Sequence, residues 1–179
     1  MNHEEHVALI AGGIEAGSGG RWADFGSGEG AFTLALCELA GADVEIWSVD
    51  RDRWALDAQR AAFAQSFPGT DLHIVWDDFT KDLFFPPLDG IMAANALHYV
   101  REQASLLRRW RDYLKQGGRL ILVEYDAAAA NRWVPYPVSA ARLPALAREA
   151  GFAEPREIGS RPSRFLRRLY AAVLTPVSY

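Results

Sequence analysis

A short glycine-rich segment constrains the fold of this chain more than any other feature. It reads Asp24-Phe25-Gly26-Ser27-Gly28-Glu29-Gly30-Ala31 and lies between an expected strand at 21–25 and an expected helix at 30–39. Glycine allows a tight strand-to-helix turn and lets a ligand approach the backbone closely. The segment therefore predicts an α/β chain with a ligand-binding loop after its first strand, and a tight turn without a ligand is the alternative.

The charges in and near this glycine loop bear on which ligand it binds. The glycine spacing fits a dinucleotide fingerprint with Ala31 in the last position. Asp24 and Glu29 add negative charge, which disfavours a pyrophosphate and favours a cationic amino-acid group. Asp50 follows the loop by about 20 residues, where a carboxylate can accept hydrogen bonds from ribose hydroxyls. Either Asp50 or Asp52 could instead cap the next helix, and we assign the ribose to Asp50 and the cap to Asp52.

The rest of the chain alternates between expected strands and expected helices. Runs of apolar and β-branched residues predict strands at 44–49, 72–76, 88–94, 119–124, 156–160 and 166–174. Apolar residues at helical spacing, together with stop signals, predict helices at 4–16, 52–67, 101–114 and 139–150. This alternation predicts a doubly wound α/β fold, in which ligands bind beyond the carboxyl ends of parallel strands.

Length and composition indicate an ordinary globular chain. The 179 residues are 50% hydrophobic and 23% charged, which predicts one domain over 1–179 with an N-terminal helix and lead-in at 1–19. No apolar run reaches about 18 residues, so we expect no membrane partner. The first residues lack the pattern of a secretory signal, and we expect a cytoplasmic protein. The single Cys37 excludes an intrachain disulfide, and no Cys/His cluster predicts a metal site.

Charge is distributed unevenly along the chain. Residues 1–100 carry 16 acidic and 5 basic side chains, whereas residues 101–179 carry 7 acidic and 14 basic ones. The acidic first half argues against a protein that wraps nucleic acid. The basic second half is compatible with an anionic partner, but we favour neutralisation of the two halves across the fold.

An ordered set of segments resembles the class I S-adenosylmethionine-dependent methyltransferases. After the glycine loop and Val49-Asp50 come Asp77-Asp78-Phe79, Leu88-Asp89-Gly90-Ile91, Asn95-Ala96-Leu97-His98-Tyr99 and Leu114-Lys115-Gln116-Gly117-Gly118-Arg119-Leu120. The resemblance covers about residues 20–125. It implies a Rossmann-like, mostly parallel seven-stranded sheet in the order 3-2-1-4-5-7-6 with the last strand antiparallel, and residues 156–174 resemble its closing hairpin.

The resemblance also implies S-adenosylmethionine as the cofactor and a set of residues that bind it. Those expected at its methionine part are Asp24, Gly26, Ser27, Gly28 and Gly30. Those expected at the ribose and adenine are Asp50, Arg51, Asp78 and Phe79, and those expected near the sulfonium are Asn95, Ala96 and Leu97. An acidic, aromatic-containing cleft suits a sulfonium cation.

Catalysis would take place at the mouth of this site, after the fourth strand. His98 is the candidate general base or substrate-orienting group, and a packed or solvent-facing loop histidine is the alternative. Tyr99 could border the transferred methyl group, although packing is the commoner role of such a tyrosine.

The acceptor is less constrained, and we favour a small molecule. Residues 127–140, with Trp133 and Tyr136, could form a lid over it or serve as a structural connector. Alternative functions are methylation of RNA or another macromolecule through the basic second half, and a non-catalytic binding or partner subunit. A dinucleotide-dependent enzyme ranks below these, and the sequence does not predict the oligomeric state. Five arginines near the end of the chain could attract a carboxylate, a phosphate or RNA, or could instead balance acidic neighbours. They are Arg156, Arg161, Arg164, Arg167 and Arg168.

Overall fold

A seven-stranded sheet forms the centre of the computed structural model, which describes residues 1–177. The strands are β1 (Gly20–Phe25), β2 (Val44–Asp50), β3 (Asp71–Trp76), β4 (Leu88–Ala94), β5 (Leu114–Tyr125), β6 (Arg156–Ser163) and β7 (Arg167–Leu174). Their order is β3-β2-β1-β4-β5-β7-β6. Strands β1 to β5 pair in parallel, and β7 runs antiparallel to both of its neighbours. The predicted fold class and strand order are confirmed.

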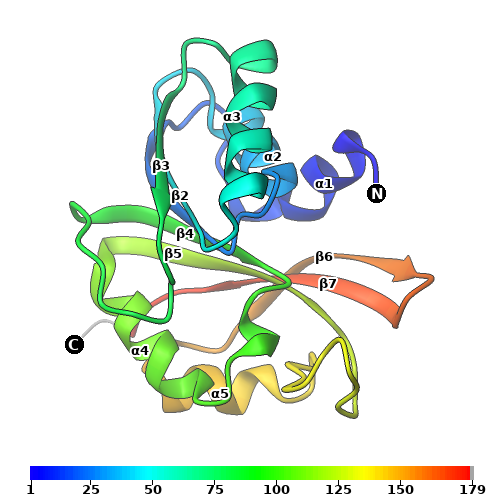
Figure 1. Cartoon of the computed structure of the whole chain (residues 1–179). Helices are drawn as coiled ribbons and strands as arrows, with labels where there is room; N and C mark the ends of the chain where they lie inside the picture. The colour runs from blue at the N-terminus through cyan, green and yellow to red at the C-terminus, as the bar shows by residue number, and fades with distance from the viewer. Residues whose placement is uncertain (178–179) are drawn as a thin grey trace.

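Helices cover both faces of this sheet (Figure 1). On one face lie α1 (His3–Ile10), α2 (Ala31–Ala40) and α3 (Arg53–Ser66), and on the other lie α4 (Gln103–Tyr113) and α5 (Leu143–Glu149). Two short 3-10 helices are η1 (Ala11–Gly13) and η2 (Leu97–Tyr99). No helix in the described part of the chain is long and apolar enough to cross a membrane.

Two helix boundaries differ from the sequence prediction for local reasons. The expected helix at 4–16 ends at Ile10 and continues only as η1, which contains the glycine pair Gly12-Gly13. The expected helix at 139–150 begins at Leu143, with Pro144 in its first turn. The Ser139 hydroxyl accepts a hydrogen bond from the Arg142 amide, in the turn that precedes α5. Ser139 therefore orders the segment before α5 and does not cap the helix.

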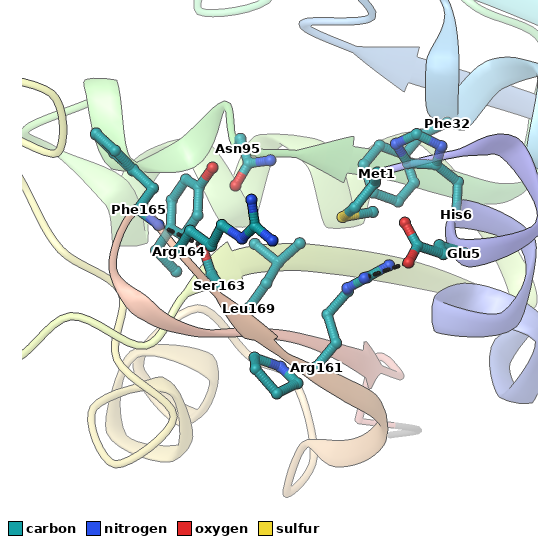
Figure 2. A pocket seen from close by; sticks show the side chains of 12 residues that line it. Met1, Glu5, His6, Phe32, Asn95, Arg161, Ser163, Arg164, Phe165 and Leu169 are labelled. Atoms are coloured by element: carbon teal, nitrogen blue, oxygen red, sulfur yellow. Dashed lines mark hydrogen bonds and ion pairs between the residues drawn. The ribbon is translucent and has the colours of Figure 1, made fainter.

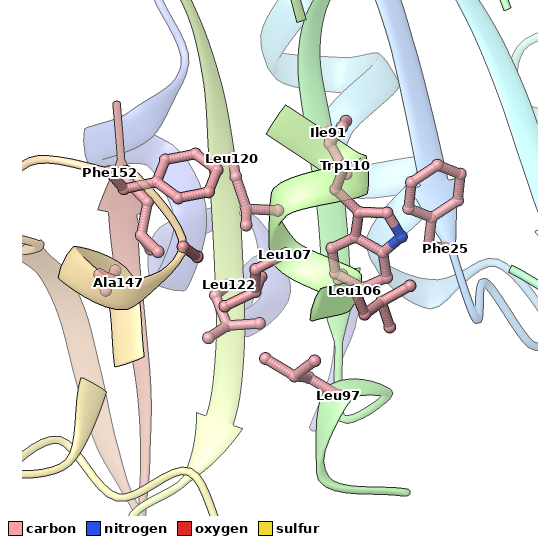
Figure 3. Close-up of a cluster of buried hydrophobic side chains, with 14 of the residues drawn as sticks. Phe25, Ile91, Leu97, Leu106, Leu107, Trp110, Leu120, Leu122, Ala147 and Phe152 are labelled. Carbon is pink, nitrogen blue, oxygen red and sulfur yellow. The ribbon is translucent and has the colours of Figure 1, made fainter. Parts of the chain in front are cut away.

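Apolar side chains fill the layer on each face of the sheet. Under α4 and α5, Phe25, Trp110, Leu120 and Phe152 belong to one buried cluster, which Figure 3 shows. Full burial of side chains of this size stabilises the fold by about 1.5–3 kcal/mol each. Leu97, the first residue of η2, is fully buried in the same cluster. This contact fixes the chain segment that follows β4.

The strand register brings the ends of several strands to one edge of the sheet. Phe25 lies opposite Val49 on β2, and Ala94 lies opposite Val123 on β5. The chain leaves β1 and β4 toward opposite faces, which makes this edge the switch point of the sheet. Because Tyr125 lies opposite Leu169, the tip of the β6–β7 hairpin reaches the same edge.

Candidate functional site

The glycine loop after β1 adopts a backbone that requires glycine. Gly26 and Gly28 have φ values of +75° and +54°. A Cβ atom on Gly26 would lie 2.7 Å from the Ala96 Cβ, so the loop after β1 and the segment after β4 touch there. A Cβ atom on Gly28 would meet nothing within 4 Å, so the space beside this residue is open.

A buried chain of polar side chains supports this loop from below. Ser27 donates a hydrogen bond to Oε1 of Gln59 at 3.2 Å, and the Ser48 hydroxyl donates to the same atom at 2.7 Å. The Gln59 amide donates to Thr33 at 2.8 Å, and Thr33 donates to Oδ2 of Asp24 at 2.6 Å. The network joins β1, β2, α2 and α3, and it holds the loop in one conformation.

Asp24 ends this network with an unsatisfied oxygen. Its side chain is buried, and Oδ1 has no hydrogen-bond partner within the described residues. Burial raises the pKa of Asp24 to about 7, against a hydrogen bond from Thr33 that lowers it. A buried carboxylate with a free oxygen beside a glycine loop fits a ligand that brings a cationic group.

A hollow of about 460 Å³ opens above the loop and holds most of the predicted cofactor residues. The predicted residues that line it are Gly26, Gly28, Asp50, Arg51, Asp78, Phe79, Asn95 and Ala96. Tyr99, predicted on catalytic grounds, lines it too and is 56% exposed. Five further residues line this hollow although the sequence did not predict them at the site. They are Asp52, Ala55, Asp77, Thr80 and Val100.

Four predicted cofactor residues do not line this hollow. Asp24 and Ser27 belong to the buried network, and Gly30 faces Gln59, whose Cγ would lie 2.5 Å from an added Cβ. Leu97 points into the apolar core. Asp24, Ser27 and Gly30 therefore shape the loop from inside the protein.

The carboxylate of Asp50 binds the backbone around the hollow. Its Oδ2 accepts a hydrogen bond from the Gly28 amide and its Oδ1 accepts one from the Asp52 amide, each at 2.8 Å. The Asp52 side chain accepts hydrogen bonds from the Trp54 and Ala55 amides and caps α3, as predicted. Asp50 is thus held in place at the hollow, with both oxygens fixed in orientation.

His98 lies behind this hollow rather than on its wall. It is 2% exposed, and its Nδ1 is 2.6 Å from Oε2 of the fully buried Glu124. The His98 amide also donates to Oε1 of Glu124 at 3.2 Å. This pair ties η2 to the end of β5, directly beside Asn95 and Tyr99.

A second hollow, of about 640 Å³, lies on the other side of Asn95 (Figure 2). Asn95 lines both hollows, its φ is +53°, and its Oδ1 is buried without a partner among the described residues. The second hollow is lined by the start of the chain, α2, the end of β5 and the β6–β7 hairpin. The lining residues include Met1, His6, Phe32, Tyr125, Arg161, Arg164, Phe165 and Leu169.

The segment 127–140, predicted as a lid, lines neither of these hollows. Val134 and Val138 are buried, and Trp133 packs edge-to-face on Phe165 with 6.5 Å between ring centroids. The segment therefore lies behind the hairpin residue that contacts the second hollow, and whether it also covers an acceptor stays a prediction.

Two of the predicted hairpin arginines are paired with acids. Arg161 bonds Glu5, and this hydrogen bond, followed by one from the Asn2 amide, lowers the pKa of Glu5 to about 2. Arg168 bonds Asp126 at 3.0 Å and also Glu157. The expectation that these arginines balance acidic neighbours holds for this pair.

Comparison with known proteins gives a family match over the first part of the chain. A family model described as a methyltransferase domain matches residues 23–120. No curated protein sequence matches the chain.

Solved structures are similar over nearly the whole chain. The YcgJ protein of Bacillus subtilis aligns with a TM-score of 0.75 and 16% identity, over 98% of this chain and 100% of that one. The 1,6-didemethyltoxoflavin-N1-methyltransferase of Burkholderia thailandensis, solved with 1,6-didemethyltoxoflavin and S-adenosylhomocysteine, has a TM-score of 0.75 and 18% identity, over 98% and 78%. The magnesium protoporphyrin IX methyltransferase of Synechocystis PCC 6803, solved with S-adenosylmethionine, has a TM-score of 0.70 and 18% identity, over 97% and 78%.

Proposed function

This chain belongs to the methyltransferase domain family, and we propose that it transfers the methyl group of S-adenosylmethionine to a small-molecule acceptor. One observation carries the proposal: two hollows of different character meet at Asn95. The first has a glycine loop and acidic walls, and the second has aromatic walls. A donor and an acceptor bound in these hollows would meet at this residue. Two of the similar solved structures are of enzymes named for small-molecule acceptors, which supports the choice of acceptor class.

The residues of the first hollow fit S-adenosylmethionine. The open space at Gly28 suits its methionine part, and the carboxylate of Asp24, buried beneath the loop with Oδ1 unpartnered, adds a negative charge that suits its ammonium group. Asp50 offers a carboxylate to the ribose hydroxyls, and Phe79 and Asp78 offer a ring face and an acceptor to the adenine. Burial raises the pKa of Asp78, but the hydrogen bonds from Thr80 and the positive charges of Arg51 and Lys81 together outweigh it. The pKa of Asp78 therefore lies below its usual value, and Asp78 accepts as a carboxylate.

The reaction needs the acceptor atom in line with the donor methyl group. When bound, S-adenosylmethionine supplies an electrophilic methyl carbon on a sulfonium. Asn95 lies between the two hollows, and the partner-free Oδ1 gives it one acceptor to orient either molecule. Tyr99 borders the donor side and offers its ring there. Such positioning of two reactants can supply about 7–11 kcal/mol of rate enhancement.

His98 lines neither hollow, so its role as a base or substrate-orienting group stays a prediction. Its Nδ1 is taken up by Glu124, so only Nε2 can act on an acceptor. If His98 acts as a base, its substitution should lower turnover by more than it lowers cofactor affinity. If His98 instead positions η2, its substitution should lower turnover and cofactor affinity together.

Calorimetric titration of the purified protein with S-adenosylmethionine and with NAD tests the proposal. We expect S-adenosylmethionine alone to bind. Asp50→Ala is expected to weaken that binding about tenfold or more, because the ribose hydroxyls lose a charged acceptor. Asp57→Ala is the matched control, since Asp57 is an exposed acid on α3 that pairs with Arg60. Equal affinities in both variants would remove Asp50 from the site.

Other outcomes would favour the alternative functions. Binding of neither ligand would contradict the proposal and favour a non-catalytic or partner-dependent protein. Retention on RNA that weakens steeply with salt would favour a macromolecular acceptor.

A further inference from the structure

One arginine of the β6–β7 hairpin points into the second hollow. Figure 2 shows Arg164 extending from the hairpin tip among the lining residues, between Asn95 and Leu169. Its side chain forms no ion pair or hydrogen bond within residues 1–177. A guanidinium presents several donors in a planar fork, which matches a carboxylate.

The other ionisable side chains that line this hollow are already paired or packed. Glu5 and Arg161 bind each other, as the dashed line in Figure 2 marks. The ring of His6 packs edge-to-face on Phe32 at 4.7 Å, and burial lowers the pKa of His6, so it is neutral at neutral pH. Arg164 is therefore the charged side chain of this hollow that has no counter-ion among the described residues.

The turn that carries Arg164 is ordered by local bonds. The Ser163 hydroxyl accepts hydrogen bonds from the Phe165 and Leu166 amides, at 3.1 and 3.5 Å. Arg167 closes the turn with φ of +63°, as in hairpins with three-residue loops. The guanidinium is thus presented from a defined turn.

Aromatic rings stand next to this guanidinium. Phe165 packs edge-to-face on Tyr125 with 5.4 Å between ring centroids, and Trp133 supports Phe165 from behind. Both Phe165 and Tyr125 line the hollow. A flat apolar molecule has ring faces and edges to contact here.

The two hollows differ in charge. The first hollow, in which we propose that the donor binds and which we call the donor hollow, is lined by four acidic side chains and one basic one. The acids are Asp50, Asp52, Asp77 and Asp78 and the base is Arg51, so this hollow suits a cation. The second hollow is lined by Arg161 and Arg164 against Glu5 alone, which suits an anion.

We propose that the acceptor is an aromatic carboxylic acid, whose carboxylate binds Arg164 while its ring packs against Phe165 and Tyr125. This inference rests on the proposed function, because it takes the second hollow as the acceptor site.

Saturation-transfer NMR and calorimetry on the complex with S-adenosylhomocysteine test it. The probes are benzoate, 4-hydroxybenzoate and 2-naphthoate, and each acid is compared with its primary amide. We expect an acid to bind more tightly than its amide, and Arg164→Gln to weaken the acid about tenfold or more without changing the amide. Arg167→Gln is the matched control, because it removes the neighbouring charge from the same turn.

Failure of this proposal is separable from failure of the proposed function. S-adenosylhomocysteine is titrated first, and its failure to bind would count against the methyltransferase function. If it binds but no acid of the panel does, or acid and amide bind alike, the carboxylate proposal is overturned. Equal affinities for the acid in Arg164→Gln and Arg167→Gln would also overturn it.

Discussion

Nδ1 of His98 lies 2.6 Å from Oε2 of Glu124, and both side chains are buried. The two residues belong to different parts of the sheet edge, η2 after β4 and the end of β5. The same carboxylate also accepts a hydrogen bond from the His98 amide. The contact therefore fixes the backbone between Asn95, which lines both hollows, and Tyr99, which lines the first.

His98→Ala should destabilise the protein, because it leaves the buried Glu124 carboxylate without its side-chain partner. We expect the free energy of unfolding in urea to fall by about 1–3 kcal/mol. Glu124→Gln should cost less, since its amide oxygen can still accept from Nδ1. His3→Ala is the control: His3 pairs with Glu38 at the exposed surface, and its loss should change stability by about 0.5 kcal/mol or less. An effect of His98→Ala as small as that of the control would show that the pair is not structural.

Binding of S-adenosylmethionine should depend on pH near neutrality through Asp24. Without ligand, burial raises the pKa of this carboxyl to about 7. A bound ammonium group favours the ionised carboxylate, so binding releases a proton and affinity rises from about pH 6 to pH 8. Calorimetry in buffers of different ionisation enthalpy counts that proton. Asp24→Asn should abolish the release, and an unchanged release would assign it to another group.

The stability of the unliganded protein should also depend on pH through Asp24, and it should fall as the pH rises. Because the folded-state pKa of Asp24 lies above its ordinary value of 3.8, the folded state binds this proton more tightly than the unfolded state. The resulting stabilisation is fully present below about pH 4 and is lost as the pH rises through about 7. Denaturation curves of Asp24→Asn should lack this component. Parallel pH profiles for both proteins would contradict the assignment.

Most residues that line the first hollow could be predicted to lie together because their positions are encoded locally. Gly26, Asp50, Asp78 and Asn95 each lie in or directly after a strand-end motif, and parallel strands bring such positions to one edge. Leu97 sits in the same motif, but the turn of η2 directs it into the core. Spacing alone does not distinguish these two directions.

The second hollow could not be predicted from local pattern. Its walls come from residues as far apart as His6, Phe32 and Arg164, which only tertiary packing brings together. The aromatic content of 127–140 suggested a lid, yet Trp133 packs behind Phe165. Gln59 was missed because a buried polar residue in an amphipathic helix shows no signal apart from its partners on other elements.

Two glycine substitutions in the loop should separate folding from binding. Gly26→Ala places a Cβ 2.7 Å from that of Ala96, at φ +75°, so we expect lost stability as well as lost cofactor binding. Gly28→Ala meets nothing within 4 Å, and its positive φ costs about 1–2 kcal/mol, so the fold should survive. Its methyl group would still narrow the donor hollow that Gly28 lines. We therefore expect Gly28→Ala to unfold cooperatively yet bind S-adenosylmethionine at least tenfold more weakly, as thermal unfolding and calorimetry would show. Gly69→Ala, at an open position away from that hollow, is the control, and equal cofactor affinity in the Gly28 and Gly69 variants would place the ligand elsewhere.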